Sequence, residues 1–260
     1  MIGDYQWVQK TQGRLTFKEK FRLIQSILMP VTVSFIRSGI TSRKHCSALR
    51  ISDIVIPDSN IVKEAFQELE YAQNPSVTAH SLRTYFIGTA IAHQKKWQFD
   101  QEDFAVASFM HDLGLVSELS LHACHCFTLE SAKQAEILCQ KHNYSEQKIQ
   151  NICDAICLHM NGHLDENDKT LSKEILMLQK ATACDVTGAN LHLIPAAFTE
   201  QLLERYPRDH FLSDFKTLIQ QESTRHPHSR TALLNKAGLG LMIQLNPLNR
   251  HSPNTEQVES

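Results

Sequence analysis

The scarcity of chain breakers is the feature of this sequence that most constrains its fold. Only 9 glycines and 8 prolines occur in 260 residues, which favours long helices joined by short loops over a sheet protein with many turns. Hydrophobic residues make up 42% of the chain and charged residues 21%, a composition typical of a globular protein with a buried core. We therefore predict an all-α fold.

Charge and cysteine usage narrow the class of function. The formal net charge of −2 argues against a dedicated nucleic-acid-binding protein, because such proteins usually carry a basic excess. No apolar run reaches the roughly 18 residues that a membrane span requires, and no secretory leader is expected. The 7 cysteines form no Cys-x-x-Cys pair, which predicts a protein of the reducing cytoplasm.

Hydrophobic periodicity divides the chain into three parts. Residues 1–54 are predicted to form a helical extension, with an amphipathic helix over 16–37 that is broken near Pro30. Residues 55–245 carry a succession of amphipathic helices, and we expect them to form the main domain. Residues 246–260 are polar and interrupted by proline, which predicts a disordered tail.

Residue types at the helix ends set the expected boundaries. Asp100, Ser145 and Ser172 are predicted N-caps, because their side-chain oxygens accept hydrogen bonds from the free N–H groups of a first turn. Gly114 is predicted to end the helix that follows Asp100. The last amphipathic segment, 232–245, is predicted as one helix.

A His-Asp doublet at the end of an apolar helix is the sharpest local motif. His111 and Asp112 follow an apolar run, and near a helix end two neighbouring side chains are able to converge on one cation. The alternative is a helix-terminal histidine stabilised by the helix dipole, with Asp112 exposed.

Asp185 indicates a buried carboxylate. It lies on a stripe that runs from Leu171 to Ala189 in steps of three and four residues, the spacing of one helical face. A carboxylate there must be paired or bound to a metal, because an isolated buried charge costs several kcal/mol. A core-facing partner such as Lys180 or Arg83 is the alternative to a metal.

His80 completes a candidate metal site. A lone histidine on an apolar helix face is more often a core residue than a ligand. Together, however, His80, His111, Asp112 and Asp185 offer two imidazoles and two carboxylates from three predicted helices. This set suits one divalent transition metal ion, Zn²⁺, Fe²⁺ or Mn²⁺, with open positions for water. His159 is predicted to contact substrate or to hydrogen-bond to a ligand, and a ligand role is left open.

In this order the residues resemble the HD-domain superfamily of metal-dependent hydrolases, and most closely its cyanamide hydratase-like branch. The resemblance rests on His-Ser-Leu-Arg-Thr-Tyr from His80, Phe-Met-His-Asp-Leu-Gly-Leu around the doublet, and Ala-Thr-Ala-Cys-Asp-Val-Thr-Gly around Asp185. It covers about residues 55 to 200, and the combination is specific although each piece is weak. The resemblance implies a helical HD-domain bundle in which these four side chains are the metal ligands. It also implies water on the metal as the nucleophile, assisted by His159.

Departures from the family pattern bear on the reaction. Many phosphodiesterase members have a lysine soon after the doublet, where this chain has Leu115. A cationic group there would help to neutralise phosphoryl charge. The resemblance therefore implies hydration or hydrolysis of a small molecule, with Arg83, His159, Phe127 and Lys180 as candidate substrate-binding residues.

Two other functions stay open. A metal-dependent phosphohydrolase of nucleotides or phosphoesters would use Arg83 or Lys180 to stabilise the transition state, and a non-catalytic helical scaffold would only bind a partner. The segment 122–126, His-Ala-Cys-His-Cys, is interpreted as a loop at the rim of the pocket, with a second metal left open. The expected partner is a small-molecule substrate rather than nucleic acid or membrane, and a homodimer is left open.

Overall fold

The described residues of the computed structural model, 1–25, 49–116 and 125–251, are helical and contain no strand. The predicted all-α class is therefore confirmed. The α-helices are α1 (Tyr5–Thr11), α3 (Asn60–Tyr71), α4 (Pro75–Lys95), α5 (Gln101–Met110), α6 (Leu113–Val116), α7 (Phe127–Lys141), α8 (Glu146–Leu158), α9 (Lys173–Thr187), α10 (Ala196–Arg205), α11 (Phe211–Arg225), α12 (Arg230–Lys236) and α13 (Leu239–Gln244). Short 3₁₀ helices are η1 (Ile51–Asp53), η3 (His159–Asn161), η4 (Leu191–Leu193) and η5 (Pro247–His251).

The N-terminal segment is helical in its described part. Residues 17–25 form a helix, in agreement with the first part of the helix expected over 16–37. The expected break at Pro30 lies outside the described residues.

The predicted N-caps are confirmed. The Asp100 side chain accepts from the first backbone N–H groups of α5. Ser145 accepts from the backbone N–H of Lys148 in α8, and Ser172 accepts from that of Ile175 in α9. Each of these short polar side chains satisfies an N–H that has no partner within its own helix.

Two predicted helix ends are wrong. The helix after Asp100 ends at Met110, and Gly114 lies inside α6 rather than after a helix end. A Cβ on Gly114 would lie 2.2 Å from the backbone oxygen of Phe127, so glycine is required there by the close approach of two backbones. The helix expected over 232–245 is divided into two at Gly238, whose φ of +102° ends the first segment.

The largest apolar core connects both ends of the described chain. It includes Tyr5 and Val8 of α1 and extends to Leu248 of η5. Helix α4 packs against α9 and α5, α8 packs against α7 and α9, and α1 rests on α7 and α8. Residues 246–260 were expected to be disordered, but Pro247–His251 form η5, in which Leu248 is buried. The domain boundaries at 55 and 245 stay predictions.

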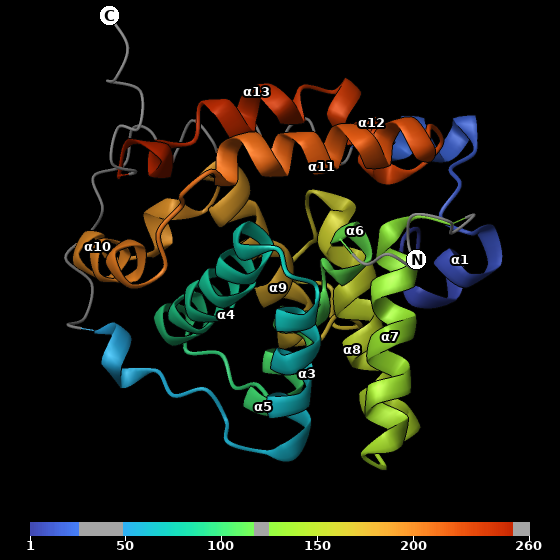
Figure 1. Ribbon diagram of the computed structural model, residues 1–260. Helices are drawn as coiled ribbons and strands as arrows, with labels where there is room; N and C mark the ends of the chain where they lie inside the picture. Colours follow the sequence, from blue (N-terminus) through green and yellow to red (C-terminus); the bar gives the residue numbers. More distant parts are fainter. Residues whose placement is uncertain (26–48, 117–124, 252–260) are drawn as a thin grey trace, which may run out of the picture.

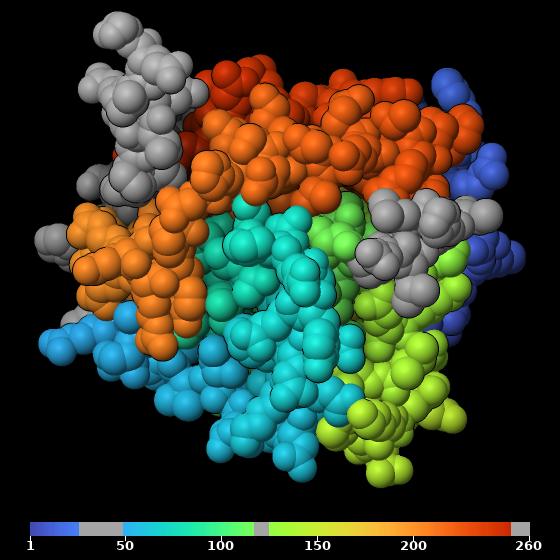
Figure 2. All heavy atoms as spheres, in the orientation of Figure 1, coloured from blue at the N-terminus to red at the C-terminus, as the bar shows by residue number. Residues whose placement is uncertain are grey.

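The C-terminal helices cover one end of the bundle. Figure 1 shows α11, α12 and α13 crossing the ends of the helices below them, and Figure 2 shows the same segment packed directly over α4 and α6. A second apolar cluster joins this layer to the bundle: Leu115, Phe127, Val186, Phe211, Phe215, Ile219 and Ile243. The functional side chains described below lie beneath this layer.

Within the described residues, we find no helix that combines the length and the hydropathy of a membrane-spanning segment.

Candidate metal centre

Two helices and the turn after one of them bring His80, His111 and Asp112 together. His80 lies in the second turn of α4, His111 directly follows the last residue of α5, and Asp112 lies between α5 and α6. None of the three is more than 2% exposed. The prediction that Asp112 and His111 meet at a helix end agrees with this arrangement, and the alternative of an exposed Asp112 does not.

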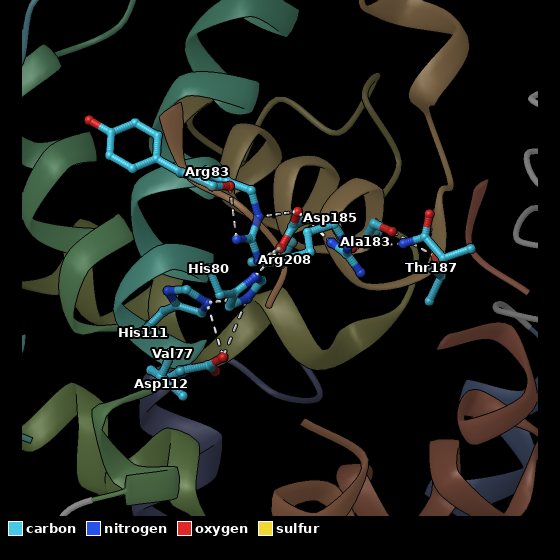
Figure 3. A network of polar contacts seen from close by, with 12 residues as sticks. Val77, His80, Arg83, His111, Asp112, Ala183, Asp185, Thr187 and Arg208 are labelled. Carbon is cyan, nitrogen blue, oxygen red and sulfur yellow. Dashed lines mark hydrogen bonds and ion pairs between the residues drawn. The ribbon is translucent and has the colours of Figure 1, made fainter. Parts of the chain in front are cut away.

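The three nearest ligand atoms form an almost equilateral triangle (Figure 3). His80 Nε2 lies 3.2 Å from His111 Nε2 and 3.4 Å from Asp112 Oδ2, and the third side, His111 Nε2 to Asp112 Oδ2, is 3.3 Å. Bonds of about 2.0–2.1 Å place the ligand atoms of a tetrahedral zinc site about 3.3 Å apart. The triangle therefore has the size of one face of a coordination shell.

Hydrogen bonds at the opposite ring nitrogens leave this triangle without a donor. His111 Nδ1 donates to the Ser108 carbonyl at 2.8 Å, so in the neutral ring Nε2 carries the lone pair. His80 Nδ1 likewise faces Asp185 Oδ2 at 2.7 Å. Asp112 Oδ2 is buried and has no hydrogen-bond partner among the described residues. When both rings are neutral, three lone pairs thus converge, and a cation bound between them would remove their repulsion.

The pKa shifts of Asp112 and His111 also show that positive charge is favourable within the triangle. Burial opposes ionisation of Asp112, but His111 and His80 outweigh it and hold the pKa of that carboxyl well below its usual range. Burial also works against protonation of His111, yet the neighbouring Asp112 raises its pKa. Burial lowers the pKa of His80 and keeps its ring neutral, the form that binds a metal. Among the described residues, these three are the group of His, Cys and acidic side chains whose ligand atoms lie within 4.8 Å of one another. Two imidazole nitrogens and a carboxylate oxygen fit a divalent metal ion.

Asp185 contacts His80 from the opposite side of the imidazole ring and does not belong to the triangle. Its Oδ1 accepts from Arg83 Nε and Arg208 Nη1, each at 2.8 Å. Its Oδ2 accepts from His80 Nδ1 at 2.7 Å and from Arg83 Nη2 at 2.9 Å. Burial opposes ionisation, but the two guanidinium groups hold the pKa of Asp185 well below its usual range. The basic partner that the sequence left open is present, and Asp185 orients His80. Its role as a metal ligand stays a prediction.

His159 presents a neutral imidazole to the cluster. Its Nδ1 donates to the Ile156 carbonyl at 2.6 Å, so the lone pair lies on Nε2, 3.6 Å from Asp112 Oδ1. Burial and the nearby His111 lower the pKa of His159 to about 3. An unprotonated ring nitrogen therefore faces the candidate metal centre throughout the neutral pH range.

Of the other predicted substrate-binding residues, Phe127 lies beside His159, whereas Arg83 and Lys180 are paired with carboxylates. The ring of Phe127 lies near the cluster, with its centroid 5.8 Å from that of His159. Arg83 is fully buried and has its donors occupied by Asp185 and by two backbone carbonyls. Lys180 forms an ion pair with Glu166 at 2.8 Å.

The sequence did not identify Arg208, Phe211 and Phe215. The rings of Phe211 and Phe215 lie 5.4 and 5.3 Å from that of His80, but their spacing of four residues is typical of any core helix. Arg208 follows α10 in a segment without periodicity. Its only signal was the requirement that a buried Asp185 have a cationic partner.

The expected rim loop is only partly described. Residues 117–124 lie outside the described part, so the prediction for His122 is not examined by the structure. His125 forms a contact with Glu130, with His125 Nε2 2.9 Å from Glu130 Oε2.

The chain is similar to known proteins over the region that contains the cluster. A family model of the HD domain matches residues 77–185. Two proteins of Saccharomyces cerevisiae, cyanamide hydratase DDI2 and cyanamide hydratase DDI3, are each 27% identical over 161 residues. Each alignment covers 61% of this chain and 70% of the relative. The residues of the triangle all lie within the matched region.

Proposed function

We propose that this chain, which belongs to the HD-domain family over residues 77–185, adds water to a small uncharged nitrile such as cyanamide. The family predicted from the sequence is confirmed, and the chain is a metal-dependent hydrolase or hydro-lyase. The substrate, the identity of the metal and the roles of single residues belong to this proposal. The single observation that carries the substrate class is that both arginines beside His80, Arg83 and Arg208, are ion-paired with Asp185.

His80, His111 and Asp112 are the proposed ligands. Their triangle of lone pairs and the buried, unpartnered Asp112 Oδ2 support this assignment. Zinc, iron and manganese in the divalent state all accept this donor set. When bound, such an ion lowers the pKa of water from 15.7 toward about 7 and acts as a Lewis acid.

His159 is proposed to orient the attacking water. Its unprotonated Nε2 faces Asp112 and accepts a hydrogen bond from that water, while its Nδ1 stays fixed by the Ile156 carbonyl. Addition forms a C–O bond at the nitrile carbon, breaks one C–N π bond and moves one water proton to nitrogen, which gives an imidic acid. Transfer of the remaining hydroxyl proton to the same nitrogen then forms the C=O bond and breaks the second C–N π bond. The product is an amide, and for cyanamide it is urea.

The charge distribution favours an uncharged substrate over a phosphoester. A phosphohydrolase needs cationic donors that are free to contact the transferring phosphoryl group. Asp185 neutralises one of the two charges of Arg83 and Arg208, and Lys180 is paired with Glu166. One net positive charge therefore remains beside the cluster, which compensates only part of the two negative charges of a phosphate.

The apolar surroundings point in the same direction. Phe211 and Phe215 pack against the ring of His80, and Phe127 packs against that of His159. These three rings belong to the apolar cluster beneath the C-terminal helices. Such a lining favours a small, weakly polar ligand held by a few placed polar atoms.

The remaining parts of the proposal concern partners and location. We propose a cytoplasmic enzyme with a small-molecule substrate, in keeping with the free, buried thiols of Cys126, Cys139, Cys153 and Cys157. The expectations of no nucleic-acid partner and of a homodimer stay predictions.

Turnover of two substrates tests the proposal. Purified protein is loaded with zinc, iron or manganese, and urea formation from cyanamide is compared with hydrolysis of bis(p-nitrophenyl) phosphate. We expect cyanamide turnover that His111→Ala abolishes and that His93→Ala, an exposed histidine of α4, leaves unchanged. Robust phosphodiester hydrolysis with inert cyanamide would favour the phosphohydrolase alternative. Turnover of neither substrate, with metal retained, would favour the scaffold.

A further inference from the structure

Arg208 lies outside the HD-domain match yet contacts the residue that orients His80. It precedes α11 and is 4% exposed. One nitrogen, Nη1, donates both to Asp185 Oδ1 at 2.8 Å and to the Asp185 main-chain oxygen at 2.7 Å. Arg208 therefore restrains the side chain and the backbone of Asp185 at the same time.

The backbone contact matters because α9 ends at Thr187. The carbonyls of the last helical turn have no N–H partner within the helix, and positive charge is favourable near them. The Asp185 carbonyl accepts from Arg208 and from Asn246 Nδ2 at 2.8 Å. Side chains from the C-terminal segment thus fix the end of the helix that carries Asp185.

The same arginine is itself held in place. Its Nη2 donates to Asn249 Oδ1 at 3.0 Å, and its guanidinium lies over the ring of Phe211, 4.4 Å from the centroid. The ring of Phe211 in turn packs against that of His80. Two routes connect Arg208 to His80: a polar one through Asp185 (Figure 3) and an apolar one through Phe211.

Arg83 does not duplicate this role. It forms the bidentate contact with the Asp185 carboxylate from α4, the helix that also carries His80. Arg208 precedes α11 of the C-terminal layer. Of the two arginines, only Arg208 donates a hydrogen bond to the backbone oxygen of Asp185. Arg83 therefore links Asp185 to α4 by hydrogen bonds, whereas Arg208 links Asp185 to the helices that cover the site.

We propose that Arg208 is a positioning residue of the metal centre: it fixes Asp185, and Asp185 fixes the ring of His80 so that Nε2 points into the ligand triangle. This inference rests on the proposed function in that His80 is taken as a metal ligand. Arg208 acts only through other residues and contacts neither the metal nor the substrate. The C-terminal segment then helps to position a metal ligand, in addition to covering the site.

Metal affinity and the tautomer of His80 test this role without any substrate. Zinc affinity is measured by competition with a chromophoric chelator for the wild type, Arg208→Lys, Arg208→Met and the control Arg205→Met. Arg205 is exposed and lies three residues earlier. Loss of a hydrogen-bonding partner behind a ligand typically weakens metal binding about 10- to 100-fold. We expect this loss in Arg208→Met, a smaller loss in Arg208→Lys, and none in Arg205→Met.

A second readout uses the metal-free protein. In ¹⁵N NMR spectra, His80 should carry its proton on Nδ1 in the wild type, and Arg208→Lys should shift that signal or add the other tautomer. Wild-type zinc affinity and an unchanged His80 signal in folded Arg208→Lys would overturn the proposal. If Arg208→Met does not fold, Arg208→Lys alone tests the positioning role. His111→Ala separates the two hypotheses. If it loses zinc while the Arg208 variants do not, only the positioning role fails; if it keeps zinc, the proposed ligands fail.

Discussion

His80 Nδ1 lies 2.7 Å from Asp185 Oδ2, and this single contact determines which face of the imidazole is available for a metal. Because an ionised carboxylate accepts hydrogen bonds and cannot donate them, Nδ1 of the neutral His80 ring carries the proton and Nε2 carries the lone pair. Nε2 then lies 3.2 Å from its counterpart in His111. The geometry gives Asp112 and Asp185 different contacts: Asp112 faces Nε2 of His80, and Asp185 faces Nδ1.

Substitution of the two carboxylates distinguishes a ligand from an orienting residue. Asp112→Asn removes the anionic oxygen of the triangle, and we expect zinc to fall below stoichiometric levels in metal analysis by mass spectrometry. Asp185→Asn leaves Arg83 and Arg208 buried without their counter-ion, which should lower the free energy of unfolding by about 3 kcal/mol or more. Zinc binding should be weakened but still measurable. Complete loss of zinc in Asp185→Asn, with unchanged stability in urea, would instead make Asp185 a direct ligand.

His159 offers a test of the proposed water-orienting role. His159→Phe keeps an aromatic ring in the buried position but removes Nε2. We expect kcat for cyanamide to fall about 100-fold or more, with the zinc content unchanged. His163→Phe, in the partly buried position four residues later, is the matched control and should retain activity. Loss of zinc from His159→Phe would indicate a ligand role, which the sequence had left open.

Gly114 provides a test of the turn that follows the doublet. In Gly114→Ala the new Cβ would meet the Phe127 carbonyl oxygen at 2.2 Å, and α6 must move away from α7. Overpacking of this kind costs about 1–3 kcal/mol, so we expect a lower midpoint in urea denaturation. Gly240→Ala in α13 is the control, because its Cβ would meet nothing closer than 3.8 Å. Equal stability of the two variants would contradict this close approach.

Glu222 predicts a pH dependence of stability. Burial raises its pKa from 4.5 to about 7, against the opposing hydrogen bond from the Phe127 N–H at 3.0 Å. The folded state then binds a proton that the unfolded state has released, so this group lowers stability as pH rises from about 4.5 to about 7. The total is about 3 kcal/mol at most, since one pKa unit corresponds to about 1.4 kcal/mol.

Substitution by a neutral isostere checks this prediction. Glu222→Gln retains an acceptor for the Phe127 N–H and should raise the free energy of unfolding at pH 8 but not at pH 4.5. Urea denaturation at a series of pH values measures the difference. Glu204→Gln, at an exposed position of α10, should show no such change. An equal effect of Glu222→Gln at both pH values would rule out a raised pKa.

Several local features were predictable because they depend on neighbours in the chain. Asp100, Ser145 and Ser172 start helices through contacts within one turn. The His111-Asp112 doublet at a helix end was recognisable for the same reason. Gly114 was interpreted wrongly because the backbone of Phe127, which requires glycine there, approaches from a different helix. Gly238 divides the last helix through its own positive φ, a conformation that an amphipathic pattern does not reveal.

The amino-acid sequence alone determined the helical class, the resemblance to the HD-domain family and the position of the His111-Asp112 doublet at a helix end, since periodicity and short motifs suffice for these. Only the tertiary structure decided which residues contact Asp185. Its burial was predictable from helical spacing, but its neighbours Arg83 and Arg208 reach it from other elements. A buried charge is stabilised by whichever opposite charges packing brings within hydrogen-bonding distance, and that depends on contacts between segments far apart in the chain.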